Sequence, residues 1–149
     1  MPDGNKAEWA AATNAYLNEL DKDPAVMDNV GGEGQSYAPE IVFTCYYDAD
    51  EQGNAYTMQQ NPDGTSTYVC HRPDELPFGV RWIARTKDED AMGMVLPATA
   101  EHKGYLYCKE RGYEKYLQTG ESVTYHIRTG LLDKDGSANL RKKIEKMGF

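Results

Sequence analysis

Three side chains that could act on one substrate follow a short run of small residues near position 100. The run is PATA at 97–100, and Glu101, His102 and Tyr105 come directly after it. A carboxylate and an imidazole can act as general base and general acid, because their ordinary pKa values lie on either side of mild acid. Small side chains would leave room for a ligand beside them. The pattern therefore predicts Glu101 and His102 as catalytic candidates, with Tyr105 next to the ligand.

The same stretch also fits an ordinary surface connection. Adjacent residues of an extended chain point to opposite sides, so Glu101 and His102 could serve one atom only if the chain turns there. Pro97 has no N–H to donate, so strand pairing should stop near it or continue only at a sheet edge. A plain loop with a solvated Glu101 is therefore the alternative to a site.

A second group of candidates lies in FGVRWIART at 78–86. If this segment is a strand, Arg81 and Arg85 lie on one face and Trp82 lies on the other. Guanidinium groups hold carboxylates or sugar hydroxyls with forked donors, and aromatic rings suit the same ligands. The alternative is a solvent-facing sheet surface that the acidic run KDEDA at 87–91 neutralises.

Metal sites and familiar catalytic motifs find little support. DADEQGN at 48–54 begins like a calcium loop, but Gln59 stands where a bidentate glutamate is needed. Cys45, Cys70 and Cys108 have no short C-x-x-C spacing and lie in strand-like runs, where small buried hydrophobes are expected. The sequence has no nucleophile elbow, phosphate-binding glycine loop or H-E-x-x-H helix. We therefore expect no cofactor and no metal.

Strands must position these candidates, and the hydrophobic period changes to two after position 40. Short alternating runs separated by turn signals are typical of an antiparallel sandwich. NPDGT at 61–65 is expected to close a hairpin, because its proline and glycine suit a tight turn. The candidate strands are 41–47, 54–60, 66–72, 78–86, 91–97, 105–110 and 122–130.

Helical spacing of apolar residues occurs near the two ends of the sequence. Residues 6–20 begin with a capping-box pattern and place Trp9, Tyr16 and Leu20 at helical spacing. Residues 137–147 place Leu140 and Ile144 on one face. We expect a single β-rich domain over 1–149, an antiparallel β-sandwich at 40–132 with a peripheral helix near each terminus.

The composition excludes several classes of partner. A net charge of -8 and an acidic pI near 4.8 argue against nucleic acid and against anionic membranes. No apolar stretch approaches the length of a membrane span, and the N-terminus is polar from the start. Three cysteines leave at least one unpaired, which fits a reducing compartment. We expect a soluble cytoplasmic protein.

Two strings, DAMGMVLPATAEHKGY at 90–105 and YLQTGESVTYHIRTGLL at 116–132, resemble the C-terminal half of galactose-mutarotase-like proteins, the aldose 1-epimerase superfamily. The likeness covers roughly 40–132. It implies a β-supersandwich in which a glutamate takes the proton of the anomeric hydroxyl and a histidine protonates the ring oxygen. The half that normally delivers the catalytic histidine has no counterpart before Glu40. The resemblance implies Glu101 as the base, surrounded by His102, Arg81, Trp82, Arg85 and Tyr105.

The sequence thus predicts a domain that binds, or acts as an epimerase on, a sugar or sugar acid. Whether it turns the sugar over stays open at this point. The alternative is an acidic protein-interaction module that has no small-molecule site and occupies a basic groove of a partner. Loss of binding with added salt would favour the module.

Overall fold

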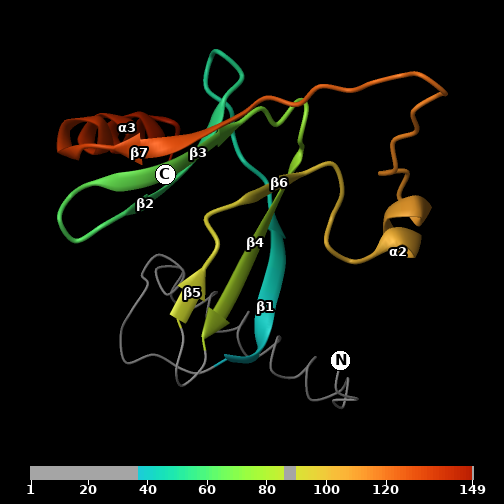
Figure 1. Cartoon of the computed structure of the whole chain (residues 1–149), viewed down its shortest axis with the longest axis horizontal. Helices are drawn as coiled ribbons and strands as arrows, with labels where there is room; N and C mark the ends of the chain where they lie inside the picture. The colour runs from blue at the N-terminus through green and yellow to red at the C-terminus, as the bar shows by residue number, and fades with distance from the viewer. Residues whose placement is uncertain (1–36, 86–89, 149) are drawn as a thin grey trace. The chain divides into compact units, whose positions relative to one another are not determined.

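The computed structural model describes residues 37–85 and 90–148, in which the chain forms two compact units (Figure 1). Residues 37–42, 82–85 and 90–93 belong to the first unit, and 43–81 and 94–148 to the second. The expectation of a single domain stays a prediction. The elements in chain order are β1 Tyr37–Cys45, β2 Ala55–Gln60, β3 Ser66–His71, β4 Phe78–Arg85, β5 Asp90–Met92, β6 Leu96–Ala98, α2 Tyr105–Glu110, β7 Ile127–Leu132 and α3 Lys134–Lys146.

A three-stranded antiparallel sheet, in the order β2-β3-β7, is the main element of the second unit. A tight turn joins β2 to β3: the Asn61 N–H donates to Thr65 O over 2.8 Å, and the Gly64 N–H donates to Asn61 O over 2.9 Å. Gly64 has a φ of 88°, which few other residues adopt. The hairpin predicted at 61–65 is confirmed.

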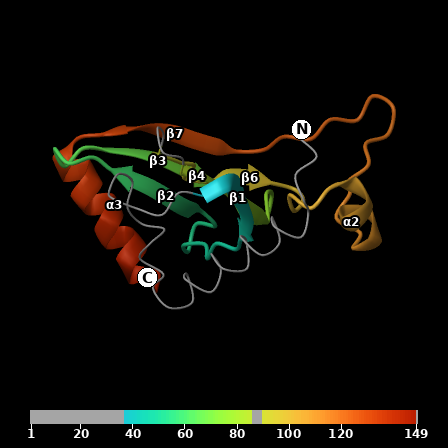
Figure 2. The ribbon, with the colours of Figure 1, turned by 90° about the horizontal axis from the view of Figure 1, so that it is seen from below.

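The helix α3 packs on one face of this sheet (Figure 2). Lys143 donates to the Tyr56 hydroxyl and Arg141 to the Gln60 side chain, so the helix covers the face on which Tyr56 and Gln60 lie. Asp133 begins the helix, since its carboxylate accepts the Gly136 N–H over 2.8 Å. The predicted C-terminal helix is confirmed, although it starts at Lys134 instead of 137.

A second sheet has the order β1-β4-β5, and β6 also pairs with β4. The pairs β4–β5 and β4–β6 are antiparallel. Pro97 stands opposite Gly79 in β6, a strand of three residues that pairs only with β4 in the described structure. The expectation that pairing near Pro97 continues only at an edge is confirmed, because proline lacks the N–H that a second neighbour would need.

Buried apolar side chains from several elements form the core of the second unit. The ring of Phe78 lies 4.9 Å from that of Tyr113 and 5.9 Å from that of Tyr46, measured between centroids. Tyr46 itself is exposed, and the buried apolar side chains of this unit are Phe78, Ala55, Cys70, Leu76, Val80, Val95 and Cys108. The contact between Phe78 and Tyr113 joins β4 to the segment that follows α2.

The predicted fold class, mostly β and antiparallel, is confirmed. The helix predicted at 6–20 lies outside the described residues. The strand predicted at 105–110 is wrong: this segment forms α2. A six-residue run rich in tyrosine fits either state, and periodicity cannot distinguish them at this length. No helix in the described ranges is long and apolar enough to span a membrane.

Candidate functional site

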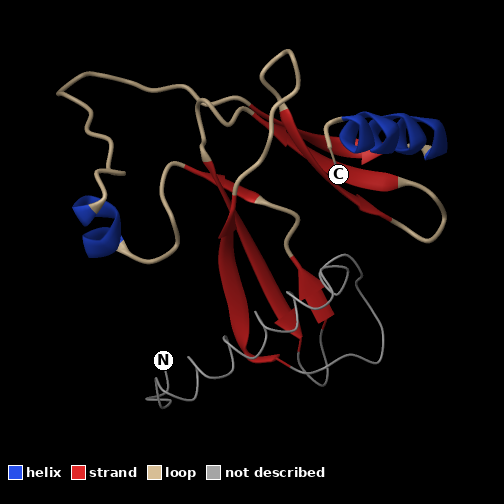
Figure 3. Cartoon of the chain, turned by 180° about the vertical axis from the view of Figure 1, so that it is seen from behind, coloured by secondary structure: helices blue, strands red, loops and turns tan. Residues whose placement is uncertain are grey.

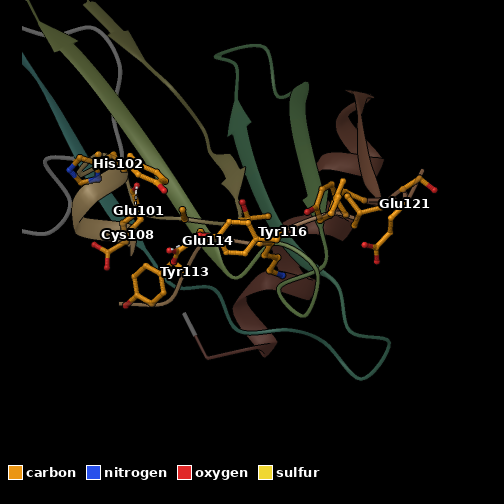
Figure 4. A pocket seen from close by; sticks show the side chains of 16 residues that line it. Glu101, His102, Cys108, Tyr113, Glu114, Tyr116 and Glu121 are labelled. Atoms are coloured by element: carbon orange, nitrogen blue, oxygen red, sulfur yellow. Dashed lines mark hydrogen bonds between the residues drawn. The ribbon is translucent and has the colours of Figure 1, made fainter. Parts of the chain in front are cut away.

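One cavity of about 650 Å³ lies in the second unit, between the loop after β6, the helix α2 and the segment that leads into β7 (Figure 4). Its volume is within the usual range of ligand sites, about 300–1,000 Å³. Glu101, His102 and Tyr105 all line it. The structure thus brings together the three residues that the sequence placed after the small-residue run.

The geometry of Gly112 redirects the chain at the end of α2. Its N–H donates to Lys109 O over 3.1 Å, and the next N–H, of Tyr113, donates to Cys108 O over 3.0 Å. These two bonds form a Schellman motif, which requires the left-handed conformation that Gly112 adopts at a φ of 67°. The helix therefore ends sharply, and the chain leaves it as an extended segment.

We call this extended segment, residues 112–126, the arm (Figure 3). A turn interrupts it where the Glu121 N–H donates to Gln118 O over 2.9 Å and Gly120 has a φ of 83°. The far end of the arm is held by Glu75, whose carboxylate accepts the His126 N–H over 2.7 Å and contacts its ring nitrogen over 2.8 Å.

Glu101 is more buried and more engaged than the sequence suggested. Its side chain is only 8 % exposed, and its Oε2 lies 3.2 Å from Lys103 Nζ. The other carboxylate oxygen accepts the Tyr107 hydroxyl over 3.5 Å. Both oxygens therefore already have partners, so a solvated loop glutamate does not describe this residue, and its role as a base stays a prediction.

The imidazole of His102 has a partner of its own on β1. Its Nδ1 shares a hydrogen bond of 3.0 Å with the Thr44 hydroxyl. Burial, together with the nearby charge of Lys103, lowers the pKa of His102, so the ring is uncharged at neutral pH. Glu101 and His102 thus have separate partners, although the chain turns at 102–103.

Tyrosine is the commonest residue type among those that line the cavity: Tyr105, Tyr113, Tyr116 and Tyr125. Tyr113 packs on Phe78, and burial together with the charge of Glu101 raises the pKa of its hydroxyl. Tyr105 and Tyr116 are exposed. Glu114, Lys115 and Glu121 supply charges around these rings, with Glu114 accepting the Tyr116 hydroxyl over 3.1 Å.

The arginines and the tryptophan predicted from β4 are divided between the two units, and their part in a ligand site stays a prediction. Arg81 does not line the cavity; its guanidinium lies 6.0 Å from the centre of the Phe43 ring. Trp82 belongs to the first unit, where its carbonyl oxygen accepts the Gly93 N–H over 2.8 Å. Arg85 ends β4 in the same unit, and its side chain lies outside the described residues.

The tyrosines of the arm are the lining residues that sequence reasoning missed. The segment 111–121 lies between two predicted strands and carries no familiar catalytic motif. A signal was available: YEKY at 113–116 places two charged residues between two tyrosines and has neither helical nor strand periodicity. Such a composition in a loop is common at binding surfaces.

Metal binding finds no support in the described ranges. No group of three or more histidine, cysteine, aspartate or glutamate side chains there is arranged to hold an ion. Asp50, in the calcium-like loop, instead binds Lys143 Nζ over 2.6 Å. The cysteines Cys45, Cys70 and Cys108 are all free, and the last two are buried, as expected for small apolar side chains.

Comparisons with protein-family models, with curated proteins and with solved structures find no match to the chain. The resemblance to galactose-mutarotase-like proteins therefore stays a prediction. The function of the chain is therefore inferred from the residues that line the cavity.

Proposed function

We propose that the cavity between α2 and the arm binds a carbohydrate or sugar acid without turning it over. The observation that carries the proposal is the lining of four tyrosines interspersed with glutamates and a lysine. Tyrosine presents an apolar ring and a polar tip, so it can cover the C–H face of a sugar while its hydroxyl bonds the rim. Carboxylates and ammonium groups pair with the sugar hydroxyls.

Binding without turnover follows from the state of the two catalytic candidates. A general base must reach the proton that it takes, over about 2.6–3.2 Å. The Glu101 carboxylate is instead held by Lys103 and Tyr107. The aldose 1-epimerase reaction would need this carboxylate released toward the sugar, whereas the bond between His102 Nδ1 and Thr44 leaves the other ring nitrogen of His102 available. We therefore assign Glu101 to support of the cavity wall.

The test begins with a panel of neutral sugars and uronic acids in ligand-observed NMR. Saturation transfer from the protein to at least one sugar is expected. Rates of mutarotation, followed by polarimetry, should equal those of a protein-free blank. Absence of transfer to every sugar would contradict binding, and faster mutarotation would contradict the assignment of Glu101.

A protein ligand is the second candidate, because Leu117 and Val123, which line the cavity, are exposed, and so is Leu106 of α2. Exposed apolar side chains that gather in one place commonly mark a protein contact. A complex that forms through these apolar residues should persist when salt is added. An acidic module bound in a basic groove should instead release its partner when salt is added. We also propose a cytoplasmic location, which the three free cysteines support.

A further inference from the structure

The strand β7 forms one edge of the sheet β2-β3-β7. It pairs with β3, and no other strand in the part of the chain that the structure describes pairs with it. Ile127, Thr129 and Leu131 lie on the face opposite α3, where Ile127 is 50 % and Leu131 83 % exposed. Alternating apolar residues are typical of a covered strand, and an uncovered apolar edge is a template for a further strand.

The backbone groups of these same residues face the open edge. The bonded pair Asn61–Thr65 begins the β2–β3 ladder, and bonded pairs alternate with non-bonded pairs from there. Counting along the register, Thr67 and Val69 bond toward β2, so Tyr68 and Cys70 bond toward β7. The backbone N–H and C=O groups of their partners Gly130 and Arg128 therefore bond to β3. The N–H and C=O groups of Ile127, Thr129 and Leu131 point to the other side, toward the open edge.

The charge of this segment indicates what can approach it. The chain carries a net charge of -8, so two copies repel each other wherever carboxylates meet. Residues 122–132 contain no Asp or Glu, and Arg128 is the one formal charge of β7. Its guanidinium bonds the Cys70 thiol over 3.3 Å and the Asn54 side chain over 3.4 Å, away from the open edge. A second copy can therefore meet this edge without repulsion.

We propose that two copies of the chain pair β7 with β7, antiparallel, about a two-fold axis at Thr129. In this register Ile127 stands opposite Leu131 of the second copy, and Arg128 stands opposite Gly130, so no like charges face each other. The contact is isologous, because the same strand serves both copies, and it joins two three-stranded sheets into one. The inference concerns the sheet edge and is independent of ligand binding in the cavity.

Sedimentation velocity over a range of protein concentrations tests the contact. The parent chain should reach the mass of a dimer, and Leu131→Lys should weaken dimerisation about tenfold or more, because the lysine charges the shared edge. Leu96→Lys is the matched control, since Leu96 is also exposed but lies in β6. Circular dichroism confirms that both variants fold. A monomer at every concentration, or equal dimerisation of parent and Leu131→Lys, would overturn the proposal.

A cysteine placed on the two-fold axis tests the register. Cα atoms of directly opposed residues lie about 5.5 Å apart, within the disulfide range of about 4.4–6.8 Å, so Thr129→Cys should cross-link to itself under mild oxidation. Gln59→Cys is the control, because Gln59 is exposed on β2, the opposite edge of the sheet. Cross-linking of Thr129→Cys no greater than that of the parent or of Gln59→Cys would refute this register.

Discussion

The ion pair between Asp50 and Lys143 offers the sharpest prediction about stability. Asp50 Oδ2 lies 2.6 Å from Lys143 Nζ, and the aspartate side chain is only 7 % exposed. The Tyr56 hydroxyl donates to the same oxygen over 2.9 Å, and the Asn54 N–H donates to the other over 2.8 Å. Replacing Lys143 with methionine keeps an unbranched apolar stem and removes the terminal ammonium group, with its charge and donors.

The expected loss follows from what remains around the carboxylate. Breaking a fully buried ion pair costs about 3–5 kcal/mol, but Lys143 is 41 % exposed, and Asp50 keeps its other donors. The loss is therefore closer to that of one charge-assisted hydrogen bond, about 2 kcal/mol. Urea unfolding, followed by circular dichroism, gives the free energy of unfolding. Lys142→Met is the control, since Lys142 is exposed on the same helix.

The pH dependence of the free energy of unfolding tests the same ion pair a second time. Burial alone would raise the pKa of Asp50, but hydrogen bonds from Lys143, Asn54 and Tyr56 outweigh it and hold the pKa well below its usual range. A carboxyl with a lowered pKa in the folded state stabilises the protein above its unfolded pKa, near 4, and this stability is lost as the pH falls below that value. Lys143→Met should flatten the dependence below pH 5. A loss under about 0.5 kcal/mol, typical of surface changes, with an unchanged pH slope would refute this account.

Three further predictions concern single residues. Gly112→Ala should lower the free energy of unfolding by about 1 kcal/mol in urea, because the φ of 67° strains a Cβ; an unchanged midpoint would contradict the Schellman motif. Glu75→Ala should speed hydrogen exchange at the His126 amide, because it removes the carboxylate that accepts this N–H over 2.7 Å, and unchanged exchange would mean that the arm is held elsewhere. Burial lowers the pKa of His71, so the unfolded chain takes up its proton first as the pH falls below about 6.5. His71→Gln should therefore reduce the loss of stability between about pH 6.5 and 5.5, and an equal loss would contradict a buried neutral ring.

The elements that could be predicted are those whose signals are local. The hairpin at 61–65 follows from its proline and its glycine, and the edge position of Pro97 follows from the missing N–H. The C-terminal helix follows from its apolar spacing, although its N-cap, Asp133, lies before the predicted start at 137.

The cavity could be predicted only in part, because long-range contacts build it. Glu101, His102 and Tyr105 lie together since they are close in sequence. Tyr116 lies at the same cavity because α2 is a helix and Gly112 turns the chain after it. The sequence instead predicts a strand at 105–110, which would not turn the chain in this way. The engagement of Glu101 by Tyr107 also depends on that helical turn.

One comparison tests the proposed carbohydrate site most directly: the affinity of Tyr116→Ala against that of Tyr46→Ala. Both tyrosines are 69 % exposed, but only Tyr116 lines the cavity. Calorimetric titration with the sugar that gives the strongest NMR response should show Tyr116→Ala weaker by about tenfold or more, equivalent to about 1.4 kcal/mol, and Tyr46→Ala equal to the parent. Equal affinity of all three proteins would contradict binding in the tyrosine-lined cavity.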